Sequence, residues 1–324
     1  MTGNYKTTPT VTPILGCLNG CNTCFFYDHV NAMRVLIGWT HGYMYADQQV
    51  KNGKVGYVTH MFNPGLHQLD LTSKSYKDFV NVSNYGCSGT FNFAYSSVNK
   101  RAFFDCRGPR TLLEMDIAAD QIVRTWNFTG VPHASPDGRY IVVLHKSVNE
   151  TVNLLLASKV YVLIISGKDS TTVLKSTLDI PGGVSSLVFD KKADKQEGFV
   201  AYISLVYSDK IAVLDLDLLK VSYIEGVGSV LSAPGMHSVN RPLLVSGSWL
   251  VSPATANNSV AIINATTRKL HGMVLGVVGG KEMVAVSPPK SPSAVPPTSS
   301  AETTYNSRKI LIFTLLPVLY TVVW

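Results

Sequence analysis

The chain has 324 residues, of which 46% are apolar and 15% are charged, and its formal net charge is +7. This composition suits a globular protein with a large core and excludes general disorder. The basic residues are scattered, and the densest group, Lys191, Lys192 and Lys195, is interrupted by Asp190 and Asp194. We therefore expect a solvated loop there and no binding of nucleic acid.

Residues 1–36 are predicted to be an irregular segment with three of the five cysteines, Cys17, Cys21 and Cys24. Their C-x3-C-x2-C spacing matches the iron–sulfur ligands of radical enzymes that cleave S-adenosylmethionine, but no βα-barrel pattern follows. A disulfide-bearing linker, or the broken end of an upstream module, is the alternative. Residues 1–12 are polar and no apolar run follows a basic start, so no signal peptide is visible.

Residues 37–287 contain five similar units. The units align on one position at the end of a predicted third strand, and this anchor position holds Asp70, Asp116, Ile164, Asp215 and Asn264. The anchors are separated by 46, 48, 51 and 49 residues. A period near fifty residues is typical of a radial repeat and not of a single sandwich.

Each unit also contains further predicted strands. The second strands are expected at 56–61, 101–106, 139–145, 199–206 and 242–248. The third strands are expected at 65–71, 111–117, 159–165, 210–216 and 259–265. The fourth strands are expected at 76–82, 121–128, 171–180, 220–227 and 269–277. Aromatic and β-branched residues fill these segments, so the sequence predicts an all-β fold, a β-propeller of four-stranded antiparallel blades.

A propeller hides the faces of its end blades by closing into a ring. Five units are visible, whereas propellers with this blade type more often close with six or seven. Either the propeller is small, or one or two blades lie upstream of Met1. We favour the second arrangement, in which the chain is a fragment of a larger propeller.

The composition changes after the repeats. Residues 288–309 are predicted to form a disordered stalk rich in Pro and Ser, and 310–324 a hydrophobic tail. The tail has 15 residues, whereas a transmembrane helix needs about 20. Small residues at 299–301 followed by a polar spacer predict a glycolipid anchor at Ser299. A tail-anchored helix and a chance apolar end are the alternatives.

Five asparagines match the N-x-S/T pattern of glycosylation acceptors: Asn81, Asn127, Asn149, Asn257 and Asn264. Roughly three such matches would arise by chance, so the count alone is weak. The positions of two acceptors strengthen the prediction of glycosylation. Asn81 and Asn127 both lie 11 residues after an anchor Asp, at the expected end of an outer strand. We expect glycosylation if the protein is secreted.

Cys87 and Cys106 flank the inner hairpin of one unit. A disulfide between them would close a loop of about twenty residues and stabilise the fold by about 3 kcal/mol. Two buried thiols are the alternative. Together with the acceptors and the tail, the pair favours a disulfide and an oxidising compartment.

Three histidines, His41, His133 and His237, recur near the starts of units. If they converged at the mouth of the channel they could hold copper or zinc. The alternative is a histidine that hydrogen-bonds a turn. The five units do not supply a complete circle of histidines around the channel. The corresponding places in the other two units hold Phe93, or a neighbour, and Ser186. We therefore expect no metal.

The anchor carboxylates Asp70, Asp116 and Asp215 are predicted to accept hydrogen bonds from turn N–H groups. The chain has no P-loop, no Gly-x-Ser-x-Gly elbow and no HExxH. The sequence therefore predicts a protein that is not an enzyme and needs no cofactor.

The segment 89–145 carries a recurring pattern at Asp116, Val123, Gly130, Pro132, Ser135, Pro136, Asp137 and Gly138. This pattern resembles the repeat of propellers named for a Tyr-Val-Thr-Asn sequence. Tyr57-Val58-Thr59 matches three letters of that name, and His60 stands in place of Asn. The resemblance covers about residues 38–287 and implies a propeller fold, but it implies little about function.

The Ser-Pro-Asp-Gly-Arg-Tyr turn and the paired cysteines also resemble the C-terminal propeller of follistatin-like, SPARC-related extracellular glycoproteins. That family's upstream modules, a Cys-rich follistatin module, an EF-hand pair and immunoglobulin domains, have no counterpart in this sequence. The resemblance implies an extracellular propeller without catalytic residues.

Three hypotheses follow. The first is a non-enzymatic propeller at the cell surface or in the matrix, a monomer that offers one face to a protein partner. The second is a metal-binding or enzymatic propeller that uses the channel histidines. The third is an intracellular scaffold whose acceptors are unused.

Overall fold

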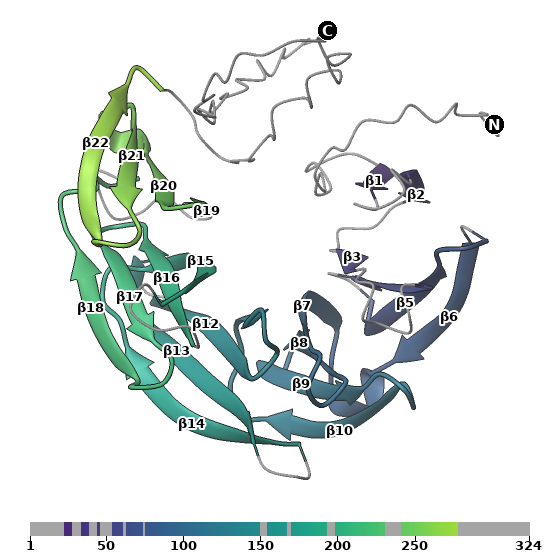
Figure 1. Ribbon diagram of the computed structural model, residues 1–324. Helices are drawn as coiled ribbons and strands as arrows, with labels where there is room; N and C mark the ends of the chain where they lie inside the picture. The colour runs from purple at the N-terminus through teal and green to yellow at the C-terminus, as the bar shows by residue number, and fades with distance from the viewer. Residues whose placement is uncertain are drawn as a thin grey trace, which may run out of the picture.

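The computed structural model describes residues 23–27, 34–38, 44–45, 54–60, 63–73, 75–149, 154–166, 170–192, 198–230 and 241–277. In this part of the chain the regular elements are β-strands and two short 3-10 turns. Five four-stranded antiparallel sheets, here called blades, follow one another in chain order around a common axis (Figure 1).

The blades have the same meander topology, in which each strand pairs with the next along the chain. Blade 1 consists of β3 (Met44–Tyr45), β4 (Val55–Thr59), β5 (Gly65–Asp70) and β6 (Ser75–Asn81). Blade 2 consists of β7 (Gly89–Ser96), β8 (Arg101–Arg107), β9 (Thr111–Asp116) and β10 (Gln121–Trp126). Blade 3 consists of β11 (Val131–Ala134), β12 (Tyr140–Asn149), β13 (Leu154–Ser166) and β14 (Thr171–Asp179). Blade 4 consists of β15 (Val184–Lys191), β16 (Phe199–Leu205), β17 (Ile211–Asp215) and β18 (Lys220–Ile224). Blade 5 consists of β19 (Leu244–Ser246), β20 (Trp249–Ala254), β21 (Ser259–Asn264) and β22 (Lys269–Leu275).

The predicted repeat is therefore confirmed, and so is the anchor position in four of the five blades. The anchor predicted for blade 3, Ile164, is wrong, because β13 runs on to Ser166, which pairs with Thr171 across the turn. Asp70, Asp116, Asp215 and Asn264 are the last residues of the third strands of their blades. Figure 1 places the fourth strands β6, β10, β14, β18 and β22 on the outer rim and the first strands toward the centre.

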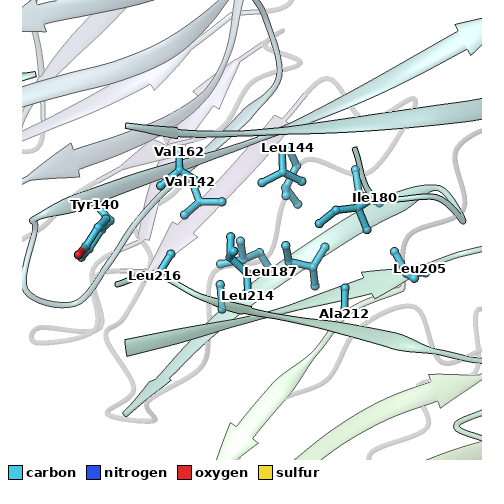
Figure 2. Close-up of a cluster of buried hydrophobic side chains, with 14 residues drawn as sticks. Tyr140, Val142, Leu144, Val162, Ile180, Leu187, Leu205, Ala212, Leu214 and Leu216 are labelled. Carbon is cyan, nitrogen blue, oxygen red and sulfur yellow. The ribbon is translucent and has the colours of Figure 1, made fainter. Parts of the chain in front are cut away.

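The core lies between blades, because side chains alternate between the two faces of each central strand. Val142 and Leu144 of β12 pack toward blade 4, against Leu187, Leu205 and Leu214 (Figure 2). Their neighbours on β12 point the other way and join a cluster with Phe103 and Leu112 of blade 2. Each such buried side chain contributes about 1.5–3 kcal/mol. Among the described residues, blades 2, 3 and 4 are each packed against a neighbour on both faces.

Tyrosine hydroxyls add polar links between neighbouring blades. Each donates a hydrogen bond to the turn after the third strand of the next blade: Tyr57 to Asp120 Oδ1 (2.6 Å), Tyr140 to Asp217 Oδ1 (2.9 Å) and Tyr202 to the Ala265 carbonyl (2.9 Å). These recurring hydrogen bonds hold neighbouring blades together and restrain the angle between them.

The prediction for the second strand of the fifth unit, 242–248, is wrong. Leu244–Ser246 is the first strand of that blade, and the second strand begins at Trp249. Gly247 and Ser248 form the turn between them, with Gly247 at φ +59°, in the left-handed region that Gly enters at little cost. The predicted strand therefore combined β19 with the turn that follows it.

Segment 1–36 was expected to be irregular, but it contains β1 (Thr23–Tyr27), which pairs antiparallel with β2 (Arg34–Gly38). Cys24 lies in β1, whereas Cys17 and Cys21 lie outside the described residues. The stalk at 288–309, Ser299 and the tail at 310–324 also lie outside them. In the part of the chain that is described, no helix is long and apolar enough to cross a membrane.

Candidate functional site

The meander gives every blade two different ends. The connections between blades and the hairpins between second and third strands lie at one end, here called the acceptor rim. The turns between first and second and between third and fourth strands lie at the other end, here called the turn rim. Chain direction alone therefore assigns each predicted residue to a rim.

Four of the five glycosylation acceptors lie on the acceptor rim. Asn81 ends β6, Asn127 follows the end of β10, Asn149 ends β12, and Asn257 lies between β20 and β21. Asn81, Asn127 and Asn257 are exposed, and the side chain of Asn149 lies outside the described part. Asn264 ends β21 on the turn rim and is half-buried.

Asn264 has a structural role that explains its identity. Its Oδ1 accepts the N–H of Thr267 at 2.8 Å. Asp70, Asp116 and Asp215 at the same position each accept two turn N–H groups at 2.8–3.0 Å through Oδ1. The predicted turn-capping role of the anchor carboxylates is confirmed. The N–H groups of Ser73 and Thr72 hold the pKa of Asp70 below its usual value.

Cys87 and Cys106 form a disulfide on the acceptor rim, with their Cα atoms 5.3 Å apart. Cys87 lies in the connection from blade 1 to blade 2, and Cys106 lies in β8. Both pack into the cluster between these blades, where Cys106 is fully buried. The bond ties the connection between blades 1 and 2 to the second strand of blade 2.

The expectation of a solvated lysine loop is wrong for Lys192, which is 4% exposed. Its Nζ donates to Asp215 Oδ1 at 2.7 Å and to Asp217 Oδ2 at 2.6 Å. Asp217 also accepts the Tyr140 hydroxyl of blade 3. Burial works against the charge of Lys192, but the two carboxylates outweigh it and raise its pKa. The side chain is part of a joint between blades 3 and 4 on the turn rim.

A second buried cation, Arg241, has no sequence pattern that marks it. It is fully buried between blades 4 and 5 on the acceptor rim. The guanidinium donates to three carbonyls and to Ser252 Oγ, and the carbonyls belong to Leu205, Ser208 and Val227. Burial lowers its pKa to about 10, so it remains charged at neutral pH.

The channel histidines are only partly described. His133 lies half-buried in β11, a first strand, whereas His41 and His237 lie outside the described residues. The described residues contain no group of three or more His, Cys, Asp or Glu side chains that could hold a metal ion.

The structure reveals a histidine pair that the sequence interpretation missed. His60 follows β4 and His67 lies in β5, with ring centroids 4.4 Å apart. His60 is 4% exposed, and its Nε2 has no hydrogen-bond partner among the described residues. His67 contacts Phe79 and, with Asn63 and Pro64, lines a shallow pocket of about 310 Å³ on the acceptor rim. Histidines on adjacent strands of one hairpin are the signal that could have indicated the pair.

We expect the pair to make blade 1 sensitive to acid. Burial, and then the neighbouring His67, lower the pKa of His60 to about 4, and burial lowers that of His67. A depressed histidine pKa means that stability is present above the unfolded value of about 6.5 and is lost as the pH falls toward 4. Between pH 7.5 and pH 5 the expected loss is about 2 kcal/mol.

Urea titrations at pH 7.5 and pH 5 on the protein and on His60→Gln test this prediction. The variant should lose less free energy of unfolding between the two pH values than the natural protein. An equal loss in both proteins would show that His60 does not titrate as argued.

Comparison with known proteins supports the architecture and gives no family. No family model matches the chain. A structure of the mitotic checkpoint complex is similar over 79% of this chain and 72% of its own, with a TM-score of 0.54 at 9% identity. Hydrazine synthase of Kuenenia stuttgartiensis is similar over 80% of this chain and 82% of its own, with a TM-score of 0.51 at 14% identity.

A weaker likeness is to the β-propeller domain of Cps50 (Swd1) of Myceliophteria thermophila, with a TM-score of 0.44 at 9% identity. It covers 69% of this chain and 64% of the other. The fold of the protein is a β-propeller. Identities this low concern the fold alone, so the function of this propeller has to be argued from its own residues.

Proposed function

We propose that the protein is a non-enzymatic propeller, displayed at the cell surface or in the matrix, that binds a protein partner through one rim. The observation that carries the proposal is the asymmetry of the two rims. Four acceptors and the Cys87–Cys106 bond lie on the acceptor rim, and one half-buried acceptor, Asn264, lies on the turn rim.

Glycans are bulky and solubilising, so they shield the surface around them. Sugars on Asn81, Asn127, Asn149 and Asn257 would cover the acceptor rim and leave the turn rim for the partner. The turn rim offers exposed apolar side chains at Val98 (40% exposed) and Leu218 (60% exposed).

The finer assignment rests on the sequence. The resemblance to Tyr-Val-Thr-Asn repeat and follistatin-like propellers supports an extracellular glycoprotein that acts as a monomer without cofactors. The pattern around Ser299 supports attachment by a glycolipid, which places the propeller on the outer leaflet. A disulfide fits the oxidising compartment that this location implies.

Surface labelling of intact cells that express the full protein tests the location. A membrane-impermeant amine reagent should label the protein, and phosphatidylinositol-specific phospholipase C should release it into the medium. Labelling only after permeabilisation would contradict the proposal and favour an intracellular scaffold. Release without phospholipase would contradict only the lipid anchor.

Chemical cross-linking on the same cells tests the binding face. Cross-links to a second protein should involve exposed lysines of the turn rim, such as Lys100 and Lys220. Lys210 on the acceptor rim, which pairs with Glu225 at 2.6 Å, is the matched control. Cross-links through Lys210 and none through the turn rim would contradict the assigned face.

A further inference from the structure

An exposed aromatic ring accompanies one of the acceptors. Phe79 and Asn81 are two residues apart on β6, so their side chains emerge on the same face of the strand. Both are exposed, and 41% of Phe79 is accessible to solvent. A large apolar ring thus stands on the surface beside a predicted attachment point for sugar.

The ring of Phe79 leans toward that attachment point. In the register of β5 and β6, Asn81 pairs with Gly65 and Phe79 pairs with His67. A Cβ atom at Gly65 would lie 2.5 Å from Cζ of Phe79, so the ring occupies the space over this glycine. Because Gly65 is directly opposite Asn81, the ring is held next to the acceptor and cannot be displaced by a side chain there.

The surroundings of the ring form a small receptor. The pocket of about 310 Å³ is lined by Asn63, Pro64, His67 and Phe79. It combines an aromatic face and a proline with amide and imidazole groups that can donate or accept hydrogen bonds. A sugar ring has the matching surfaces, with an apolar face of C–H groups and an edge of hydroxyl and acetamido groups.

The acceptor itself is compatible with attachment in this geometry. Asn81 Oδ1 accepts the N–H of Ser83 at 2.8 Å, a bond that fixes the side chain through its oxygen. Glycosylation uses the amide nitrogen instead. Nδ2 loses a proton and bonds to C1 of N-acetylglucosamine, and the sugar leaves a polyprenyl diphosphate donor supplied with the transferase by the secretory pathway.

We propose that the first N-acetylglucosamine on Asn81 packs its apolar face against Phe79 and occupies the pocket lined by Asn63, Pro64, His67 and Phe79. The inference rests on the proposed function, because it requires glycosylation of Asn81. The glycan is then part of the structure of blade 1. It covers an aromatic ring that water otherwise contacts, and it ties β6, an outer strand, to the β4–β5 hairpin.

Asn127 provides an internal comparison, because it occupies the equivalent place in blade 2. The residue two positions before it is Thr125, which offers no ring. The nearby Phe128 is already stacked on Tyr161, with ring centroids 4.0 Å apart. The ring of Trp126 is covered by the guanidinium of Arg124, whose Cζ lies 4.5 Å from the ring centroid. We therefore expect a sugar on Asn127 not to stabilise its blade.

The test compares glycoforms of the full protein, purified from cells and trimmed enzymatically to a single N-acetylglucosamine at each site. Ser83→Ala removes the sugar from Asn81 but keeps the Asn81 side chain and the backbone N–H that it accepts. Removal should raise the unfolding equilibrium constant about fivefold, which corresponds to about 1 kcal/mol. Asn127→Gln should raise it by less than twofold.

The same comparison in the background of Phe79→Leu isolates the ring, because leucine keeps an apolar side chain that the strand tolerates. The effect of Ser83→Ala should then fall to that of Asn127→Gln. In a spectrum of the sugar labelled with ¹³C, protons of the Asn81-linked ring should be shifted upfield by Phe79, and Phe79→Leu should abolish the shift.

The outcomes distinguish the glycosylation of Asn81 from the packing of its sugar against Phe79. Unmodified Asn81 in glycopeptides from these cells would overturn both the proposed glycosylation and this inference. Modified Asn81 with an equal effect of Ser83→Ala in both backgrounds, and no upfield shift, would overturn the packing alone and leave the proposed function standing.

Discussion

Replacing Arg241 with Met is expected to destabilise the propeller by about 3–5 kcal/mol. The side chain is fully buried and donates four hydrogen bonds that join blades 4 and 5. Methionine fills a similar volume but leaves three carbonyls without these donors, and each unsatisfied buried group costs about 1–3 kcal/mol. The free energy of unfolding in urea measures the loss.

Two further variants distinguish the hydrogen bonds from the packing. Arg241→Lys keeps a charge with fewer donors and should lose an intermediate amount. Ser252→Ala removes one of the four acceptors and should cost about 1 kcal/mol. Arg241→Met with the stability of the natural protein would mean that the guanidinium does not hold the two blades together.

Removing the disulfide with Cys87→Ala and Cys106→Ala together should cost about 3 kcal/mol. The bond spans a sequence separation of 19 residues and restrains the unfolded chain. Both cysteines are nearly or fully buried, and alanine leaves only a small cavity at each position. The free energy of unfolding from urea titrations, with the slope fitted for each protein, reports the difference, and the slope should rise because the unfolded chain is no longer restrained.

The chain has three other cysteines, so a reductant is the matched control. Reduction of the natural protein should lower its stability to nearly that of the double variant. Reduction of the double variant should change little. A large further loss on reducing the double variant would assign the stabilisation to other cysteines.

The sequence predicted the repeat well because its signals are local. A turn-capping Asp or Asn ends the third strand in four of five blades, and the strand period of two follows from one-sided burial. The alignment was wrong by two residues in blade 3, where Ser166 and not Ile164 ends the third strand.

The joints between blades were missed because they depend on contacts between residues far apart in sequence. Lys192 reaches Asp215 and Asp217, 23 and 25 residues away, and Arg241 reaches carbonyls 14 to 36 residues away. In the sequence a charged residue in a loop resembles any solvated residue. Only the angle between blades decides that these two are buried.

In the candidate site, too, the features with local sequence signals could be predicted, and those that depend on distant contacts could not. The acceptors are visible as motifs, and the rim on which each one lies follows from the direction of its strand. The aromatic ring beside Asn81 needed the register of β5 and β6, because only Gly65 opposite the acceptor lets Phe79 lean over it.

The occupancy of each of the five acceptors, in protein isolated from its own cells, shows which rim is covered by glycans. Enzymatic release of glycans in heavy-oxygen water marks each occupied asparagine for mass spectrometry. We expect marks at Asn81, Asn127, Asn149 and Asn257 on the acceptor rim and none at Asn264, which is half-buried on the turn rim. Five unmarked asparagines, or a mark at Asn264 with the acceptor rim bare, would contradict a propeller that presents its turn rim to a partner.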